Sequence, residues 1–520
     1  MNFFLKLTSA ISVIFVFCLA SAQENMFLDP GFEAIRKGTE TPYWWRLVSE
    51  GSGSAIPDFK DKHSGQKSLR VSVQENENTL TIRYFSAPFK IQPGTRYLYS
   101  LWAKGEGILN LVVQQRVEEI NAPPQNARRI NALKSPDFQL EKEWKRYDFP
   151  ITADADPALY SIEPQIVLSG KNAWALLDDA ELKAIQGSDQ KKLLNEFSAC
   201  SVVKAGMKAE FIYSPDLLPE GTVLKFGSGL KELNDERKTV FPDGKIAINV
   251  PEKTGCYGFS ISNLQKGIGR RCYVHVLSDS QYERIKKTAE NIQNPGMVLV
   301  LGDSLSDYLR DYNWVGVVSY FCREKFPGKS IWYNYAVGGD MAPRILNRLE
   351  DVPDTYARER YRGIKEVKPD LIMISLGQND SLSLDRDLKE QSPTQVPPNQ
   401  FKECMTKIIA RLRKQYPGAK IVLFTPFALC TEKCRKFFFA NRKLLFGEPS
   451  ITKKYVELVQ EIGGETGCDV LDVYTPFRML EDSSSFFLPD GIHLNVAGNL
   501  YAAEVVLKYL TQSREGDQKK

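Results

Sequence analysis

Four short polar segments carry residue types that together could break an ester bond. They are Gly302-Asp303-Ser304-Leu305-Ser306, Asn334 to Asp340, Gly377-Gln378-Asn379-Asp380, and Asp490-Gly491-Ile492-His493. The first three segments each end an apolar run of the kind expected for a buried strand. In an open α/β sheet, ligands bind outside the carboxyl ends of the strands. We therefore expect these segments to converge on one crevice.

Ser304 is the candidate nucleophile, and it needs a base because a serine hydroxyl is unreactive until its proton is removed. That base is usually histidine, whose pKa lies near neutral pH. The chain has 3 histidines, and His63 and His275 fall in strand-rich regions far from Ser304 in the sequence. His493 is therefore the predicted base, and Asp490, three residues earlier, is predicted to orient its ring in a triad.

The tetrahedral intermediate of ester hydrolysis needs hydrogen-bond donors for its oxyanion. The backbone N–H of Ser304, the backbone N–H of Gly339 and the side-chain amide of Asn379 are the predicted donors. Glycine lets the backbone approach a ligand closely, and asparagine donates where aspartate cannot.

The four segments, in this order, resemble the blocks of the SGNH hydrolases, also called GDSL esterases and lipases. The resemblance covers about Met297 to Leu510 and implies a flavodoxin-like three-layer α/β fold, no metal or other cofactor for catalysis, and hydrolysis of acyl esters. It carries Gly339 and Asn379 onto the family's oxyanion positions. Met341 stands where many members have Thr or Ser, which puts one supporting hydrogen bond in question. Taken singly, Ser304 also fits a plain helix N-cap, Asn379-Asp380 an ordinary turn and His493 a satisfied surface histidine.

The region from 289 to 515 alternates apolar runs with helical patterns. The runs are Met297 to Leu301, Ile331 to Val337, Leu371 to Leu376, Ile421 to Thr425 and Val470 to Val473. Continuous apolar strands that alternate with helices indicate a parallel sheet covered on both faces. We predict that this region is the catalytic domain.

Two regions before the catalytic domain show short alternating runs separated by Gly, Pro and Asp, which is typical of β-sandwiches. Residues 23–186 form the first predicted domain. Residues 187–288 form the second, which we predict to be immunoglobulin-like. The predicted fold is thus multidomain, with two β-sandwiches ahead of an α/β domain.

The first β region resembles carbohydrate-binding modules with a galactose-binding-like jelly roll. The matching pieces include Asp29 to Glu33, Ser64 to Val71 and Leu177 to Leu182. The resemblance implies a structural calcium ion held by early and late acidic residues, and Glu33 and Asp179 are the matching positions. Trp44 and Trp45 either stack on sugar rings or fill the core of the sandwich.

Residues 1–22 at the N-terminus are predicted to form a secretory signal peptide. Lys6 precedes an apolar run from Ala10 to Leu19, and Ala20-Ser21-Ala22 forms the cleavage motif. The apolar run is too short to span a bilayer, so we expect a secreted or periplasmic protein without a transmembrane anchor. Export permits disulfides, and Cys200 paired with Cys256 or Cys272 is one option.

The composition excludes some partners. The 520 residues carry a formal net charge of +4, with 68 basic against 64 acidic side chains, which gives no reason to expect nucleic acid. The predicted function is a secreted serine esterase that releases acyl groups, above all acetyl, from a polysaccharide or oligosaccharide through an acyl-enzyme on Ser304. The alternatives are a lipase or general carboxylesterase without a carbohydrate role, and a catalytically silent glycan-binding protein.

Overall fold

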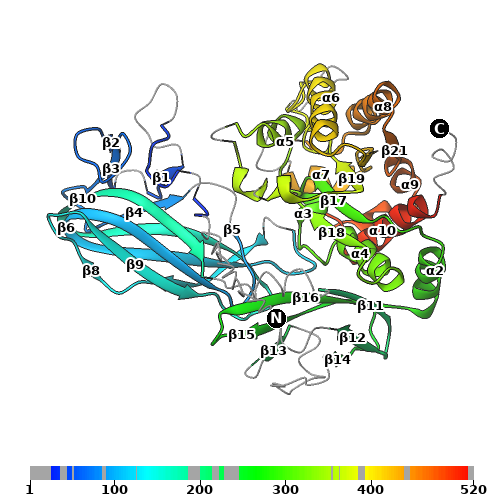
Figure 1. Ribbon diagram of the computed structural model, residues 1–520, viewed down its shortest axis with the longest axis horizontal. Helices are drawn as coiled ribbons and strands as arrows, with labels where there is room; N and C mark the ends of the chain where they lie inside the picture. Colours follow the sequence, from blue (N-terminus) through cyan, green and yellow to red (C-terminus); the bar gives the residue numbers. More distant parts are fainter. Residues whose placement is uncertain are drawn as a thin grey trace, which may run out of the picture.

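The computed structural model describes most of the chain after the predicted signal peptide, and residues 1–22 lie outside the described part. The described residues are 25–27, 29–35, 44–49, 52–84, 89–123, 126–185, 199–212, 222–227, 245–352, 355–361, 363–384, 393–438 and 445–512. Figure 1 shows three bodies along the chain: a β-domain (25–185), a small β unit (199–277) and an α/β domain (279–512).

The β-domain is built on two long antiparallel strands, β6 (Arg96–Val117) and β10 (Leu159–Ala184), which run side by side. Register shifts, one of them between Ser169 and Trp174, let these strands bend around the core. The strands are β1 (Trp45–Leu47), β2 (Gly53–Asp58), β3 (Ser68–Val73), β4 (Thr79–Tyr84), β5 (Phe89–Lys90), β6 (Arg96–Val117), β7 (Arg128–Lys134), β8 (Phe138–Gln139), β9 (Lys145–Thr152) and β10 (Leu159–Ala184).

Alternation along the strands decides what fills this domain. In β3, Leu69, Val71 and Val73 are buried in the core, as the period of two requires. Trp44 and Trp45 are both buried in the same core, so neither offers a face for stacking on a sugar. The predicted β-rich domain is confirmed, whereas its galactose-binding identity stays a prediction.

The small β unit holds a four-stranded sheet in the order β11-β16-β15-β13 and a separate pair, β12 with β14. All ten residues of β16 are buried, because the strand has the β12–β14 layer on one side and neighbouring domains on the other. The strands are β11 (Cys200–Lys204), β12 (Lys208–Ile212), β13 (Val223–Phe226), β14 (Lys245–Asn249), β15 (Gly255–Asn263) and β16 (Ile268–Leu277). The region is β-rich as predicted, and its immunoglobulin-like identity stays a prediction.

The suggested disulfide within this unit is wrong, because Cys200, Cys256 and Cys272 are all free thiols in the structure. Their side chains belong to three different hydrophobic clusters. Cys200 packs against the α/β domain, Cys272 lies in the core of the small β unit, and Cys256 lies at the junction with the β-domain. Alternation along β16 places Cys272 on the opposite face of the sheet from Cys200 and Cys256, which lie beside Tyr273 and His275.

The α/β domain contains a five-stranded, entirely parallel sheet in the order β18-β17-β19-β20-β21. This order, 2-1-3-4-5 within the domain, is the flavodoxin-like one and confirms the expected α/β fold. The strands are β17 (Met297–Gly302), β18 (Ile331–Asn334), β19 (Leu371–Ser375), β20 (Lys420–Phe424) and β21 (Asp469–Leu471).

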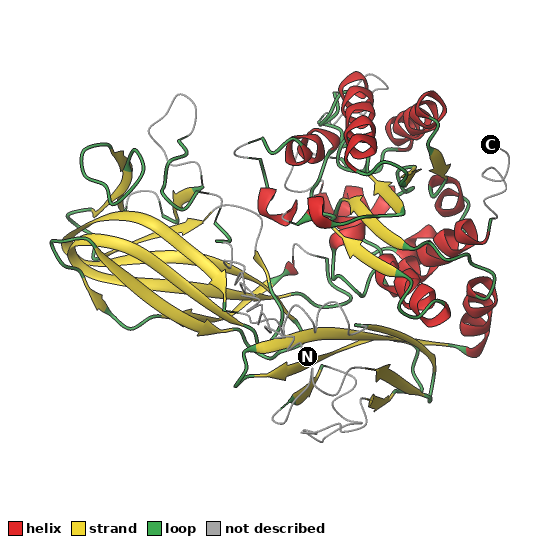
Figure 2. Ribbon diagram, in the orientation of Figure 1, coloured by secondary structure: helices red, strands yellow, loops and turns green. Residues whose placement is uncertain are grey.

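Helices cover both faces of this sheet, as Figure 2 shows. Val298 and Val300 face a cluster that includes α4 and α10, whereas Leu299 and Leu301 face one that includes α5, α6 and α8. The helices are α2 (Asp279–Ala289), α3 (Ser304–Asp307), α4 (Trp314–Lys325), α5 (Ala342–Leu349), η3 (Arg358–Tyr361), η4 (Ile364–Glu366), α6 (Pro398–Gln415), α7 (Thr431–Phe438), α8 (Pro449–Thr466), α9 (Tyr474–Arg478), η5 (Ser483–Phe486) and α10 (Val496–Thr511). Among the described residues, no helix combines the length and apolar character that a bilayer span requires.

Candidate active site

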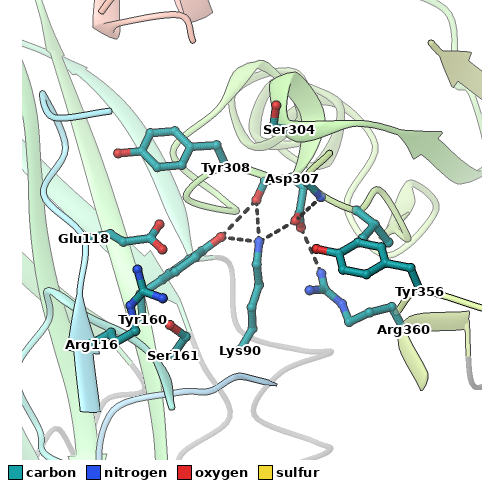
Figure 3. A pocket seen from close by; sticks show the side chains of 12 residues that line it. Lys90, Arg116, Glu118, Tyr160, Ser161, Ser304, Asp307, Tyr308, Tyr356 and Arg360 are labelled. Carbon is teal, nitrogen blue, oxygen red and sulfur yellow. Dashed lines mark hydrogen bonds and ion pairs between the residues drawn. The ribbon is translucent and has the colours of Figure 1, made fainter. Parts of the chain in front are cut away.

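Ser304 is the first residue of helix α3, directly after the strand β17. Asp303 caps this helix, since its carboxylate accepts a hydrogen bond from the Leu305 N–H at 3.0 Å. The cap turns the chain sharply at the carboxyl end of the central strand. It leaves Ser304 partly exposed on the wall of a cavity of about 200 Å³ (Figure 3).

Asp490 and His493 form a tight turn that orients the imidazole. One carboxylate oxygen of Asp490 accepts the backbone N–H groups of Ile492 and His493 at 3.0 and 3.1 Å, and the other lies 2.6 Å from His493 Nδ1. Burial raises the pKa of Asp490. Hydrogen bonds and the attraction of His493 outweigh burial and lower the pKa overall, so this side chain is a carboxylate at neutral pH.

The packing of this turn requires glycine at position 491. Gly491 has a φ of 74°, and an added Cβ would lie 2.5 Å from the backbone nitrogen of Cys434 in α7. Helix α7 therefore presses directly on the turn and holds the Asp490–His493 pair in place.

His493 keeps one ring nitrogen available for Ser304. Its Nε2 is buried and has no hydrogen-bond partner among the described residues. The His493 ring lies 5.4 Å from the ring of Tyr308, which lines the same cavity as Ser304. The structure contains no hydrogen bond from Ser304 Oγ to Nε2 within the described part. In ligand-free enzymes such catalytic contacts are often long, and they tighten when substrate binds.

The predicted oxyanion donors lie on three segments at the carboxyl ends of neighbouring strands. Gly339 has a φ of 78°, and an added Cβ would meet nothing closer than Arg344 Nη1 at 3.9 Å, so its backbone borders open space. Neither Ser304 N–H nor Gly339 N–H has an acceptor among the described residues. Both groups thus remain able to bind an oxyanion.

Asn379 is held between two segments of the site. Its Nδ2 donates to the Asp340 carbonyl at 2.9 Å and lies 3.5 Å from Asp303 Oδ2. The longer distance is outside the range of a good N–H···O bond. The hydrogen bond to the Asp340 carbonyl therefore fixes the side chain, and the second amide hydrogen remains available for a stronger acceptor.

The departure at Met341 is compensated by a residue from another segment. Met341 occupies the cap position of α5 and makes no side-chain cap bond. Asp380 Oδ1 instead accepts the Ala342 N–H at 2.8 Å. The supporting hydrogen bond that the sequence put in question is therefore supplied by the segment that carries Asn379.

Three buried acids lie beneath the site, and each has a raised pKa. Burial raises the pKa of Asp303 to about 8, and the nearby carboxyls of Asp380 and Asp340 act in the same direction. Burial also raises the pKa of Asp380 to about 7. Asp340 is paired with Arg348, yet burial still raises its pKa to about 6.

The remaining histidines and the predicted calcium ligands lie elsewhere. His275 is buried in β16, and burial lowers its pKa to about 4. Nδ1 of His63 lies 2.6 Å from Asp179 in the β-domain, and Glu33 accepts the Gln66 N–H at 2.7 Å. No cluster of three or more potential metal ligands occurs in the part of the chain that the structure describes. Because protein donors already engage Glu33 and Asp179, the arrangement does not call for a cation, and the calcium stays a prediction.

The sequence reasoning missed a connection between the helix that begins with Ser304 and the β-domain. Lys90 Nζ lies 2.6 Å from Asp307 Oδ2, and it donates to the Asp307 carbonyl at 3.0 Å. The hydroxyl of Tyr160 also donates to that carbonyl, at 3.1 Å (Figure 3). The Tyr308 hydroxyl donates in the opposite direction, to the Glu119 carbonyl at 3.0 Å. The β-domain therefore fixes the helix that begins with Ser304.

Asp307 forms ion pairs with three basic side chains, those of Lys90, Arg310 and Arg360. Arg310 and Arg360 each donate to its Oδ1 at 2.9 Å, and the Gly338 N–H donates to Oδ2 at 2.9 Å. Burial raises the pKa of Asp307, but the attraction of Arg360, Lys90 and Arg310 outweighs it and holds the pKa well below its usual value. The signal available in the sequence was an acid three residues after the serine and three residues before Arg310. Nothing in the sequence indicated Lys90.

Comparison with known proteins agrees with this geometry. Residues 300–500 match the GDSL-like lipase/acylhydrolase family. This chain carries a GDSL-type SGNH hydrolase domain. The mouse isoamyl acetate-hydrolyzing esterase 1 homolog is 25% identical over 171 residues, which are 31% of this chain and 69% of that protein. The Arabidopsis thaliana GDSL esterase/lipase CPRD49 is 22% identical over 147 residues, 28% of this chain and 56% of that protein.

Among solved structures, an acetyl xylan esterase is 19% identical with a TM-score of 0.31, and the match covers 41% of this chain and 98% of that one. The family match places this SGNH domain among the carboxylic ester hydrolases. A partly exposed serine, a carboxylate-oriented histidine and backbone N–H groups without an acceptor are residue types suited to acyl transfer.

Proposed function

We propose that this protein is a secreted serine esterase that removes acyl groups, above all acetyl, from a polysaccharide through an acyl-enzyme on Ser304. The observation that carries the proposal is the state of His493. Its ring is fixed by a buried carboxylate, and its Nε2 has no partner among the described residues. The centre of the ring lies 5.4 Å from that of Tyr308, which shares a cavity with Ser304. A histidine held in this way is suited to act as a general base.

In the proposed reaction, His493 Nε2 accepts the Ser304 hydroxyl proton while Oγ bonds to the ester carbonyl carbon. The carbonyl oxygen becomes an oxyanion that accepts hydrogen bonds from Ser304 N–H, Gly339 N–H and Asn379 Nδ2. The bond to the leaving alcohol then breaks, and that oxygen takes the proton from His493. The acyl group stays on Ser304 as an ester.

Deacylation uses the same groups with water in place of the alcohol. His493 accepts a proton from a water molecule while the water oxygen attacks the acyl carbon. The oxyanion that forms accepts hydrogen bonds from the same donors as before. When the bond to Ser304 breaks, Oγ takes the proton back, and the carboxylic acid is released. Asp490 balances the positive charge that His493 carries in each half of the reaction.

Two observations favour acetyl groups on a carbohydrate. The mammalian relatives are named for hydrolysis of isoamyl acetate, an acetyl ester, and the cavity beside Ser304 is small, about 200 Å³. Strands of the β-domain line that cavity together with Ser304, so a bulky, polar alcohol would contact both domains. The predicted signal peptide supports export, where polysaccharides are found.

The alternative is a general carboxylesterase, which the same relatives favour because isoamyl acetate contains no sugar. Acetate release from acetylated xylan and pectin, measured beside hydrolysis of 4-nitrophenyl acetate and 4-nitrophenyl palmitate, separates these functions. Polysaccharide esterase activity predicts acetate release that Ser304→Ala abolishes. Hydrolysis of the 4-nitrophenyl esters without acetate release would favour the alternative. Ser304-independent hydrolysis would exclude the mechanism.

A further inference from the structure

The cavity beside Ser304 is a composite of two domains that are far apart in the sequence. The β-domain supplies Lys90, Arg116, Glu118, Tyr160 and Ser161 to its wall. The SGNH domain supplies the rest, which are Ser304, Asp307, Tyr308, Val337, Gly338, Tyr356 and Arg360. Figure 3 shows Ser304 at one side, with Arg116, Glu118 and Ser161 on the opposite side. Whatever is bound near Ser304 therefore also meets the β-domain.

Positive charge exceeds negative charge around this cavity. Lys90 of the β-domain shares the single carboxylate of Asp307 with Arg310 and Arg360 of the SGNH domain. Burial lowers the pKa of Lys90 in spite of the adjacent Asp307, and repulsion from Arg360 and Arg310 lowers it further. Arg310 and Arg360 alone outnumber the single carboxylate of Asp307, so a surplus positive charge remains close to Ser304.

Basic side chains also outnumber acidic ones in a second cluster, around Glu163 of the β-domain. Glu163 accepts Arg116 at 2.7 Å and Arg129 at 3.1 Å, and Arg83 lies 4.0 Å away. Arg116 lines the cavity, whereas the side chain of Arg129 is 54% exposed and does not line it. Two separate clusters thus surround one cavity with more basic than acidic groups.

Unpaired polar atoms line the β-domain wall. Arg116 Nε, Glu118 Oε2 and Ser161 Oγ are buried and have no hydrogen-bond partner among the described residues. Buried polar groups in proteins are normally paired, so these atoms at the cavity wall are available to hydrogen-bond a polar group bound there. Burial raises the pKa of Glu118 to about 7, although Lys90, Arg271 and Arg116 act to lower it. In its protonated form Glu118 donates a hydrogen bond and does not repel an anion.

We propose that this cavity binds a carboxylate of the substrate next to the scissile ester, and that Arg116 determines this specificity. The inference rests on the proposed esterase function and narrows its substrate class. Guanidinium is the side chain best suited to bind a carboxylate. The carboxylate belongs either to the alcohol portion, as in a uronic acid residue, or to the acyl portion, as in a dicarboxylic monoester.

Two matched pairs of substrates distinguish these sources. The first pair is a mono-O-acetylated methyl hexuronide and the corresponding methyl hexoside, which differ only in carboxylate against CH₂OH. The second pair is 4-nitrophenyl hemisuccinate and 4-nitrophenyl butyrate. We expect the wild-type protein to prefer the anionic member of one pair by ~10-fold or more in kcat/KM, as charge-assisted hydrogen bonds typically provide. We also expect 0.5 M salt to weaken the preference.

Arg116→Gln should reduce the anionic-to-neutral ratio of kcat/KM to near one, and Arg116→Lys should retain part of the preference. Arg129→Gln is the matched control, because it removes a partner of the same Glu163 outside the cavity and should leave the ratio as in the wild type. Ester hydrolysis with no preference in either pair, or a preference that survives in Arg116→Gln, would overturn this inference and leave the esterase function standing. Hydrolysis of no ester at all would overturn both.

Discussion

Lys90 and Asp307 join the β-domain to the nucleophile helix by an ion pair of 2.6 Å. The two residues are 217 positions apart, and Asp307 is only three residues after Ser304. The Lys90 side chain is largely buried and also donates to the Asp307 carbonyl. This contact makes the β-domain part of the active-site structure and not a module on a free linker.

Lys90→Gln should weaken this junction and lower kcat. Asp307 would keep Arg310 and Arg360, so we expect a loss of about 2 kcal/mol in stability, less than the ~3–5 kcal/mol typical of a broken buried pair. Thermal unfolding and kcat on 4-nitrophenyl acetate measure the two effects. Lys104→Gln is the control, because Lys104 pairs with Asp61 within the β-domain. Equal effects of the two substitutions would argue against a role for the junction in catalysis.

Asp490→Asn should keep the fold of the turn and lower kcat by ~10⁴-fold, as loss of the orienting carboxylate does in serine hydrolases. Asparagine can still accept the Ile492 and His493 N–H groups through its oxygen, but it cannot stabilise a protonated His493. Steady-state kinetics with a chromogenic acetyl ester test this. Asp482→Asn, at a carboxylate that accepts Ser484 Oγ at 2.7 Å and makes no contact with His493, serves as control. An Asp490→Asn protein with near wild-type kcat would remove Asp490 from the mechanism.

Asn379→Ala should lower kcat by ~10²–10³-fold with little change in KM, because an oxyanion donor acts in the transition state and not on bound substrate. The substitution also removes the bond to the Asp340 carbonyl, so thermal unfolding must be measured alongside. A parallel rise in KM, or a kcat loss explained by unfolding at the assay temperature, would contradict the predicted role.

As pH rises from about 4 to about 8, the Asp303→Asn variant should become more stable relative to the wild type. The pKa of Asp303 is raised by burial to about 8, so the native state binds a proton that the unfolded state has released. Stability of the wild type therefore falls with pH across that interval, and the contribution levels off above pH 8. Asparagine keeps the cap bond to Leu305 without a titrating proton. Melting temperatures of both proteins between pH 4 and pH 9 test this, and a difference independent of pH would refute it.

Much of the site was readable from the sequence because its residues occur in local motifs. Asp303-Ser304 follows a strand, and Asp490 reaches His493 within a single turn, so the residue types and short spacings predict both geometries. Strand positions were also predicted to within a few residues. The second apolar run was expected to reach Val337, but the strand β18 ends at Asn334 because the chain there turns into the site.

The sequence by itself determined the candidate catalytic residues, the α/β and β-rich domain classes and the helix–strand alternation, because each depends on neighbours within one element or turn. Only the tertiary structure decided that Cys200, Cys256 and Cys272 are free thiols, what replaces the cap at Met341, and that Lys90 and Arg116 line the cavity beside Ser304. These outcomes depend on how separate elements pack, and residue spacing along the chain does not predict a contact between two domains.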